Sequence, residues 1–287
     1  ATVKFDGTIE QSFVTPADMA FILPSLHTFH DKLFIASSFS GTGTSVNIGS
    51  FVVNSPSGDI NIDTKGWYKK QGARGLWYAD VKHLGVSSKT IEFLSENLKG
   101  EKTEVPDVLR RLGNIDFNGN AAATRDGAIT ARGNVRTGVG NVDIKFHMDD
   151  NNHFGATAVT DGIDLKTLAD NHHLGTAALN VNAQGALKAA GGKPSIDVKG
   201  TVSKFSYDGY TFSNIDLNAT YSASSIGGKV SIDDPNIRLS ADGSLSTLGK
   251  GKDIALAVNI DDICPQAINL SSRWGDARFS AIVTADM

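Results

Sequence analysis

The feature that most constrains this chain of 287 residues is a strand pattern that recurs along most of its length. Apolar and polar residues alternate, and a tight polar turn follows; the clearest copy runs from Thr211 to Leu245, with its turn at Asp233-Asp234-Pro235-Asn236. Successive side chains on a strand point to opposite faces, so each such strand has one apolar and one polar side. The repetition predicts a long antiparallel sheet whose apolar face must be either covered or used.

Turn residues indicate that neighbouring strands are antiparallel. Asp-Gly, a dipeptide that suits the positive φ angles of hairpin turns, recurs through the sequence. It stands at 6–7, 126–127, 161–162, 208–209 and 242–243. The pattern alone leaves two all-β architectures open, a sealed sandwich and a sheet curled into an open trough.

Short helical segments are expected to interrupt the strands. The first follows Thr15, with Pro16 at the first helical position and Asp18 in the first turn, an arrangement typical of a helix N-terminus. The four segments are expected at 15–26, 88–98, 106–112 and 164–169. They are too few to cover the whole apolar face of the sheet.

The regularity of the strands changes along the chain. Residues 1–112 read as an irregular β segment with short helices, and residues 113–287 as a repeated hairpin array continuous with it. Leu-Gly stands between a short helical segment and a new strand at both 112–113 and 174–175, which supports a modular array. Alternation continues to both ends, and stacked repeats need caps. We therefore expect the chain to be a fragment of a longer protein.

Composition and motifs exclude several classes of function. A net charge of −4 and a pI near 6.0 argue against a nucleic-acid partner. The single cysteine, Cys264, allows no internal disulfide, and no apolar run approaches the length of about 18 residues that spans a membrane. His27 and His30 lack the further ligands of a zinc site, and there is no Gly-x-Ser-x-Gly motif. We expect a protein that is not an enzyme and has neither a cofactor nor a metal.

The heaviest aromatic residues of the chain stand close together in the sequence. They are Trp67, Tyr68, Trp77 and Tyr78. We interpret them as a hydrophobic plug at the end of the sheet; the alternative is an exposed aromatic surface of a glycan-binding or adhesive protein.

Several stretches together resemble a known family. They lie at 15–26, 39–42, 112–115, 208–210 with 214–220, 231–239 and 257–270. The chain resembles a middle segment of proteins in the TamB/AsmA-like superfamily (translocation and assembly module), and more specifically its Bacteroidetes-type members. The resemblance covers nearly the whole chain and rests on structural patterns, not on a catalytic signature.

The resemblance implies a cellular location and binding partners. Such proteins are anchored in the inner membrane, cross the periplasm and carry a curled sheet with an apolar groove, the β-taco. It therefore favours an all-β fold built as an elongated curled antiparallel trough of repeated hairpins. It also implies a periplasmic location, an inner-membrane anchor in a missing N-terminal part, and an Omp85-type outer-membrane partner met through a missing C-terminal part.

The function that the resemblance implies is to bind or conduct phospholipid along the groove for outer-membrane biogenesis. Acyl chains need a continuous apolar surface without directional partners, and each buried methylene contributes about 0.8 kcal/mol. The groove candidates are Ile115, Phe117, Ile144, Phe146, Leu179, Val181, Ile215, Leu217, Val230, Ile232, Ile237, Leu239, Leu256 and Val258. The alternative is a non-enzymatic scaffold that aids assembly or secretion of outer-membrane β-barrel proteins through open sheet edges.

Overall fold

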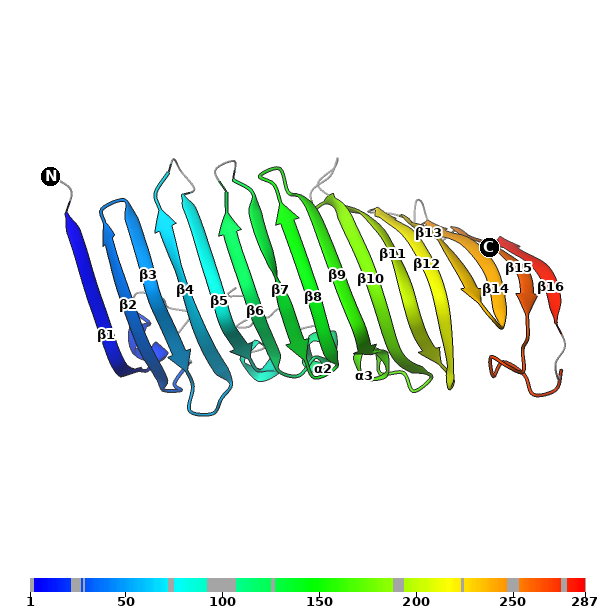
Figure 1. Cartoon of the computed structure of the whole chain (residues 1–287), viewed down its shortest axis with the longest axis horizontal. Helices are drawn as coiled ribbons and strands as arrows, with labels where there is room; N and C mark the ends of the chain where they lie inside the picture. The colour runs from blue at the N-terminus through cyan, green and yellow to red at the C-terminus, as the bar shows by residue number, and fades with distance from the viewer. Residues whose placement is uncertain are drawn as a thin grey trace. The chain divides into compact units, whose positions relative to one another are not determined.

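The computed structural model describes residues 3–21, 27, 29–71, 75–91, 107–124, 127–187, 194–222, 225–246, 253–274 and 278–286. The fold is all-β, with 70% strand and 7% helix, which confirms the predicted class. The described residues form one antiparallel sheet of sixteen strands in sequence order, not closed into a barrel (Figure 1). A sealed sandwich would need a second sheet, so this alternative does not hold for the described residues.

The chain divides into two compact units, Ala1–Asn141 and Val142–Met287, and each is described by itself. The predicted change at 112/113 concerns the regularity of the strands, which this division does not test, so it stays a prediction.

The first unit consists of seven described strands and short helices. Its elements are β1 (Lys4–Val14), the 3-10 helix η1 (Pro16–Met19), β2 (Leu33–Thr42), β3 (Ser45–Asn54), β4 (Ile60–Lys69), β5 (Leu76–Val86), α2 (Asp107–Arg111), β6 (Ile115–Ala123) and β7 (Ile129–Thr137).

The second unit continues the alternation of strands and tight connections, and its first strand begins at the boundary between the units. Its elements are β8 (Gly140–Met148), β9 (His153–Asp164), α3 (Leu165–Ala169), β10 (Leu174–Ala186), β11 (Ser195–Tyr207), β12 (Tyr210–Ser222), β13 (Ser225–Asp234), β14 (Ile237–Ser246), β15 (Asp253–Ile263) and β16 (Phe279–Asp286).

Two predicted helices form nearly as expected. Helix α3 begins after Asp164, whose side chain accepts a hydrogen bond from the backbone N–H of Thr167 at 3.2 Å, and α2 covers most of 106–112. The segment predicted at 15–26 is a single short 3-10 helix where it is described, and 22–26 lie outside the described residues. The segment at 88–98 is helical over 88–91, and its remainder also lies outside them.

Cross-strand register gives the second unit one apolar face. Leu217 of β12 lies opposite Val230, Val230 opposite Ala241, and Ala241 opposite Val258. Directly opposed residues point to the same side of a sheet, so these four side chains form one apolar row across the strands. The alternation in the sequence therefore continues in register from strand to strand.

Register shifts occur at two places in the second unit, in the pairing of β10 with β9 and β11 and in the pairing of β15 with β14 and β16, whereas β11 to β14 pair without a shift. The shifts lie just beyond the row of successive cross-strand partners Leu179, Val202, Ile215, Ile232, Leu239 and Ile260. They occur between Ala177 and Leu179 in β10, between Arg238 and Leu239 in β14 and between Ile260 and Ile263 in β15. A bulge bends its strand and increases the local twist, so these strands bend at this end of the apolar face.

A connecting segment covers this end of the apolar face, which we call the covered end. Residues 264–274 follow β15, and Pro265 within them is fully buried. Ile268 packs against Ile237 and Ile263 in a cluster that also contacts Phe212. In the first unit Phe29, which precedes β2, packs in the same way against Leu33, Val53 and Ile60. Each unit thus has a small core at the end of the strands where the longer connections run.

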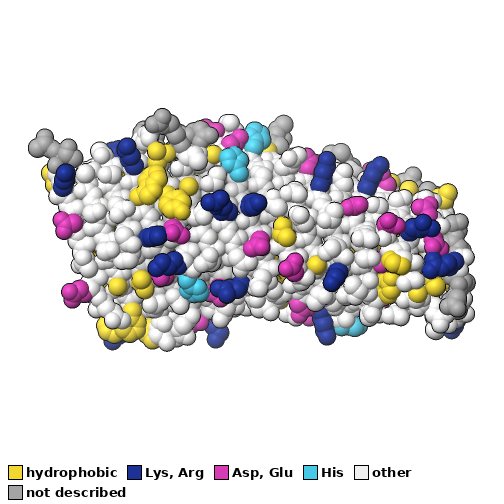
Figure 2. Space-filling model, viewed as in Figure 1, with side chains coloured by type: hydrophobic (Ala, Val, Ile, Leu, Met, Phe, Trp, Pro, Cys, Tyr) yellow, Lys and Arg dark blue, Asp and Glu magenta, His cyan; other side chains and the backbone are white. Residues whose placement is uncertain are grey.

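The other face of the sheet is polar. Figure 2 views this face and shows Lys, Arg, Asp and Glu side chains dispersed over it, with few hydrophobic patches. Ion pairs such as Lys65–Asp80 at 3.2 Å and Lys229–Asp242 at 3.0 Å join neighbouring strands on it. Exposed pairs of this kind contribute little stability.

Candidate apolar groove

The uncovered part of the apolar face in the second unit forms a shallow groove with a volume of about 430 Å³. We call it the open groove and define it by the apolar-face residues of four strands, β12 to β15. They are Leu217, Ala219, Ile226, Gly228, Val230, Ala241, Gly243, Leu245, Ile254 and Leu256. Their side chains share one face because they alternate with polar residues along each strand and stand opposite one another between strands.

The open groove exposes large apolar side chains to solvent. Ile226 is 50% exposed, and Val230 and Leu256 are 40% and 41% exposed. Scattered exposed apolar residues are normal on a protein surface, but here they are contiguous across strands. Such a surface can take up an apolar chain from water without a directional contact.

Two glycines form the floor of the groove. Gly228 of β13 and Gly243 of β14 are cross-strand partners. A Cβ atom on Gly228 would stand 2.8 Å from the backbone oxygen of Asn218, so the close approach of β12 requires glycine there. A Cβ on Gly243 would meet Leu256 at 3.4 Å, an ordinary contact. The fold therefore does not require glycine at position 243, although the missing side chain there makes the groove deeper.

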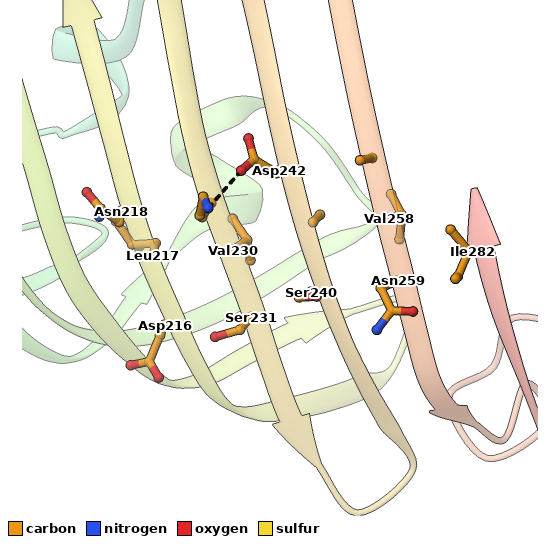
Figure 3. Close-up of a pocket in the computed structure, with 13 residues that line it drawn as sticks. Asp216, Leu217, Asn218, Val230, Ser231, Ser240, Asp242, Val258, Asn259 and Ile282 are labelled. Carbon is orange, nitrogen blue, oxygen red and sulfur yellow. Dashed lines mark ion pairs between the residues drawn. The ribbon is translucent and has the colours of Figure 1, made fainter. Parts of the chain in front are cut away.

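The opposite side of the same strands is polar. Asp216, Asn218, Lys229, Asp242 and Asn259 alternate with the apolar residues and, with them, line a second depression of about 410 Å³. Figure 3 shows this arrangement on β12 to β15, with Ile282 of β16 beside it, and marks the ion pair between Lys229 and Asp242. The two faces of these strands therefore offer opposite chemistries.

A buried carboxylate braces the covered end. Asp234 is 4% exposed and accepts hydrogen bonds from the Tyr210 hydroxyl, from the backbone N–H and hydroxyl of Ser213 at 3.0 and 2.8 Å, and from the backbone N–H of Asn236 at 3.0 Å. Burial raises the pKa of Asp234, but the hydrogen bonds from Tyr210, Asn236 and Ser213 outweigh it and hold the pKa below the ordinary value. The ionised group thus joins the start of β12 to the turn between β13 and β14.

The predicted groove residues separate into groups. Leu217, Val230 and Leu256 line the open groove. Val258 lies in the same row, opposite Ala241. By contrast, a second group lies at the covered end. Ile215 and Ile237 are buried there, and Ile232 and Leu239 pack against the buried cluster.

The remaining candidates lie on other strands. Leu179 and Val181 of β10 stand opposite Val202 and Gly200, and continue the same rows. Ile144 and Phe146 are half-buried on β8. Ile115 and Phe117 belong to the first unit, where they lie opposite Val86 and Leu84. The structure thus brings only part of the predicted set together in one groove.

Sequence reasoning left several groove residues out of the candidate set. Ile226, Leu245 and Ile254 line the groove, and Gly228 and Gly243 give it depth. A signal was present, because Gly227-Gly228 interrupts an otherwise alternating strand, and glycine within a strand often marks a place that a ligand or another backbone approaches.

Within the described ranges, no group of three or more His, Cys, Asp or Glu side chains is arranged to hold a metal ion. None of the described helices is long and apolar enough to cross a membrane. Compared with known proteins, the chain matches no family model, no curated protein and no solved structure.

Proposed function

We propose that the open groove binds phospholipid acyl chains, and that the chain is a periplasmic segment of an envelope-spanning protein which uses this groove in outer-membrane biogenesis. The observation that carries the proposal is the continuity of the apolar row from β12 to β15, over which none of the described elements packs. The resemblance to the TamB/AsmA-like superfamily supports the location and the class of ligand.

The chemistry of the groove suits an acyl chain better than a polar ligand. Its apolar-face lining contains only aliphatic side chains and glycine, so it offers van der Waals contact and no side-chain hydrogen bond. Each methylene moved from water onto such a surface contributes about 0.8 kcal/mol when fully buried, and less on a shallow floor. Several methylenes are therefore needed for stable binding, which a long acyl chain supplies.

The test is to purify the chain from bacterial cells without detergent, extract it with organic solvent and quantify bound phospholipid by mass spectrometry. Leu217→Asp places a charge inside the groove, and we expect it to remove most of the bound lipid. Asn218→Asp is the matched control, because the adjacent side chain points to the polar face and stands opposite Lys229. It should leave the lipid content unchanged.

Two outcomes would overturn the proposal. One is a folded wild-type chain that carries no phospholipid, which would favour the scaffold for β-barrel proteins instead. The other is equal lipid content in the folded Leu217→Asp and Asn218→Asp variants. Circular dichroism and thermal unfolding of both variants show whether a loss of lipid reflects the groove or a loss of folding.

A further inference from the structure

The four heavy aromatic residues of the first unit do not form one cluster, which corrects the predicted plug. Tyr68 and Trp77 are cross-strand partners, and so are Trp67 and Tyr78. Because neighbours along a strand point to opposite faces, the first pair lies on the apolar face and the second on the polar face. A function for Trp67 and Tyr78 must therefore be sought on the polar side of β4 and β5.

Trp67 belongs to a row of polar-face residues that crosses five strands. Its members are successive cross-strand partners: Asp6, Ser40, Asn47, Trp67 and Tyr78. We call them the aromatic row. Four strand spacings of about 4.8 Å make the row roughly 19 Å long. Figure 2 shows a patch of hydrophobic side chains over β4 and β5, among polar surroundings.

The surface is hollowed along this row. Strands β1 to β4 line a depression of about 510 Å³. Trp67 is 43% exposed at one end of it. Lys4 and Lys69 add positive charge beside the negative charge of Asp6, so both signs are present in the lining. The combination is a half-exposed indole surrounded by polar groups.

The polar groups of the row are free to bind something else. Among the residues that the structure describes, the side chains of Asp6, Ser40 and Asn47 have no hydrogen-bond or ion-pair partner. The nearby hydroxyls of Thr42 and Ser45 are joined to one another at 2.9 Å. A carboxylate, a hydroxyl and an amide thus stand in line with an exposed aromatic ring.

We propose that the aromatic row binds a β-linked polysaccharide. A pyranose ring with equatorial substituents has a flat C–H face that stacks on an indole, and hydroxyls at its edge that hydrogen-bond to carboxylates and amides. The row supplies both kinds of contact and is long enough for several sugar units. A nucleic acid requires a basic surface, whereas this lining carries both charges. A protein interface needs about 800 Å² on each partner, with an apolar centre larger than two aromatic side chains.

The experiment is isothermal titration of the purified chain with two probes, the β-1,4-linked hexamers of glucose and of N-acetylglucosamine. We expect at least one probe to bind the wild-type chain. Trp67→Ala should weaken that binding roughly two- to tenfold, the factor that corresponds to one lost aromatic stacking contact. Trp77→Ala, on the opposite face beside Tyr78, is the matched control and should bind as the wild type does.

A second variant guards against a folding defect. The Asn47 side chain is exposed and has no described partner, so Asn47→Ala should fold normally and still weaken sugar binding. Binding of neither hexamer by the wild type, unchanged binding in both Trp67→Ala and Asn47→Ala, or an equal loss in Trp77→Ala would overturn the proposal. The site is separate from the open groove, so its failure would leave lipid binding untouched.

Discussion

The apolar face of the second unit has two regions built from the same residue types but with different exposure. At the covered end Ile215 and Ile237 are 7% and 5% exposed, whereas Val230 and Ile226 in the open groove are 40% and 50% exposed. The same strands run through both regions. The difference arises from the segment 264–274, whose Ile268 packs over the covered end, and the register shifts of β14 to β16 fall at the same level.

This comparison separates two roles that the alternation of residues does not distinguish. Apolar side chains at the covered end pack on each other and are buried, so they contribute to the stability of the unit. Apolar side chains in the open groove remain half in water and are available to a ligand. Substitutions in the two regions should therefore affect different measurements.

The largest expected effect on stability is at the covered end. Ile237→Ala removes a buried side chain from the cluster with Ile263 and Ile268, and we expect it to lower the free energy of unfolding by about 2–5 kcal/mol. Ile226→Ala, at a half-exposed groove position, should lower it by about 1 kcal/mol or less. Urea denaturation measures both. Equal losses would show that the two regions do not differ in packing.

The buried carboxylate of the covered end comes next. Asp234→Asn replaces an acceptor by an amide that cannot accept from Tyr210, Ser213 and Asn236 together, and should lower the free energy of unfolding by about 1–3 kcal/mol. Asp233→Asn, at the neighbouring exposed position, is the control and should have a much smaller effect.

The same residue predicts a dependence on pH. The pKa of Asp234 is lower in the folded state than its ordinary value of 3.8, so ionisation favours folding. Its contribution is complete above the unfolded-state pKa and is lost as the pH falls from about 4 through the folded-state pKa. Unfolding curves of the wild type between neutral pH and about pH 2 should show this loss. If Asp234→Asn shows the same acid dependence, the hydrogen-bonded carboxylate is not its source.

A substitution that fills the groove should affect lipid binding more than stability. Gly243→Leu adds bulk to the groove floor, where a Cβ makes only an ordinary contact with Leu256, so stability should change by less than about 1 kcal/mol while bound phospholipid falls several-fold. Gly155→Leu is the control, because a Cβ there has no neighbour within 4 Å and points to the polar face. An unchanged lipid content in Gly243→Leu would show that the open groove is not where the lipid binds.

The smallest effect is expected on the polar face. Lys229→Ala breaks an exposed ion pair with Asp242 and should change the free energy of unfolding by less than about 0.5 kcal/mol. Lipid content should stay the same. A decrease in the free energy of unfolding as large as that of Ile237→Ala would mean that the polar face contributes as much to stability as the covered end does.

The sequence was sufficient for the strands and for their two faces. Alternation places Leu217 and Val230 on one side and Asn218 and Lys229 on the other, and the register keeps this arrangement across strands. It was not sufficient to separate Ile237 from Ile226. Bulges depend on hydrogen bonding between strands, and the burial of Ile237 depends on Ile268, a residue of a later connection.

The arrangement of the four heavy aromatic residues also could not be predicted from their positions in the sequence alone. Trp67 and Tyr68 are adjacent in the sequence, and adjacency alone predicts one cluster with Trp77 and Tyr78. Period-two geometry would have separated them, provided that β4 and β5 were recognised as strands across this whole stretch. Turn-rich composition at 70–75 concealed the ends of both strands.

The most direct test of the central claim is photo-crosslinking at one groove position and one matched position on the other face. A benzophenone amino acid replaces Ile226 in one variant and Lys229 in the other, and each purified protein is irradiated with vesicles of labelled phosphatidylethanolamine. The account predicts a labelled adduct from position 226 and none from position 229. Equal labelling at both positions, or labelling at 229 alone, would contradict the claim that the open groove receives acyl chains.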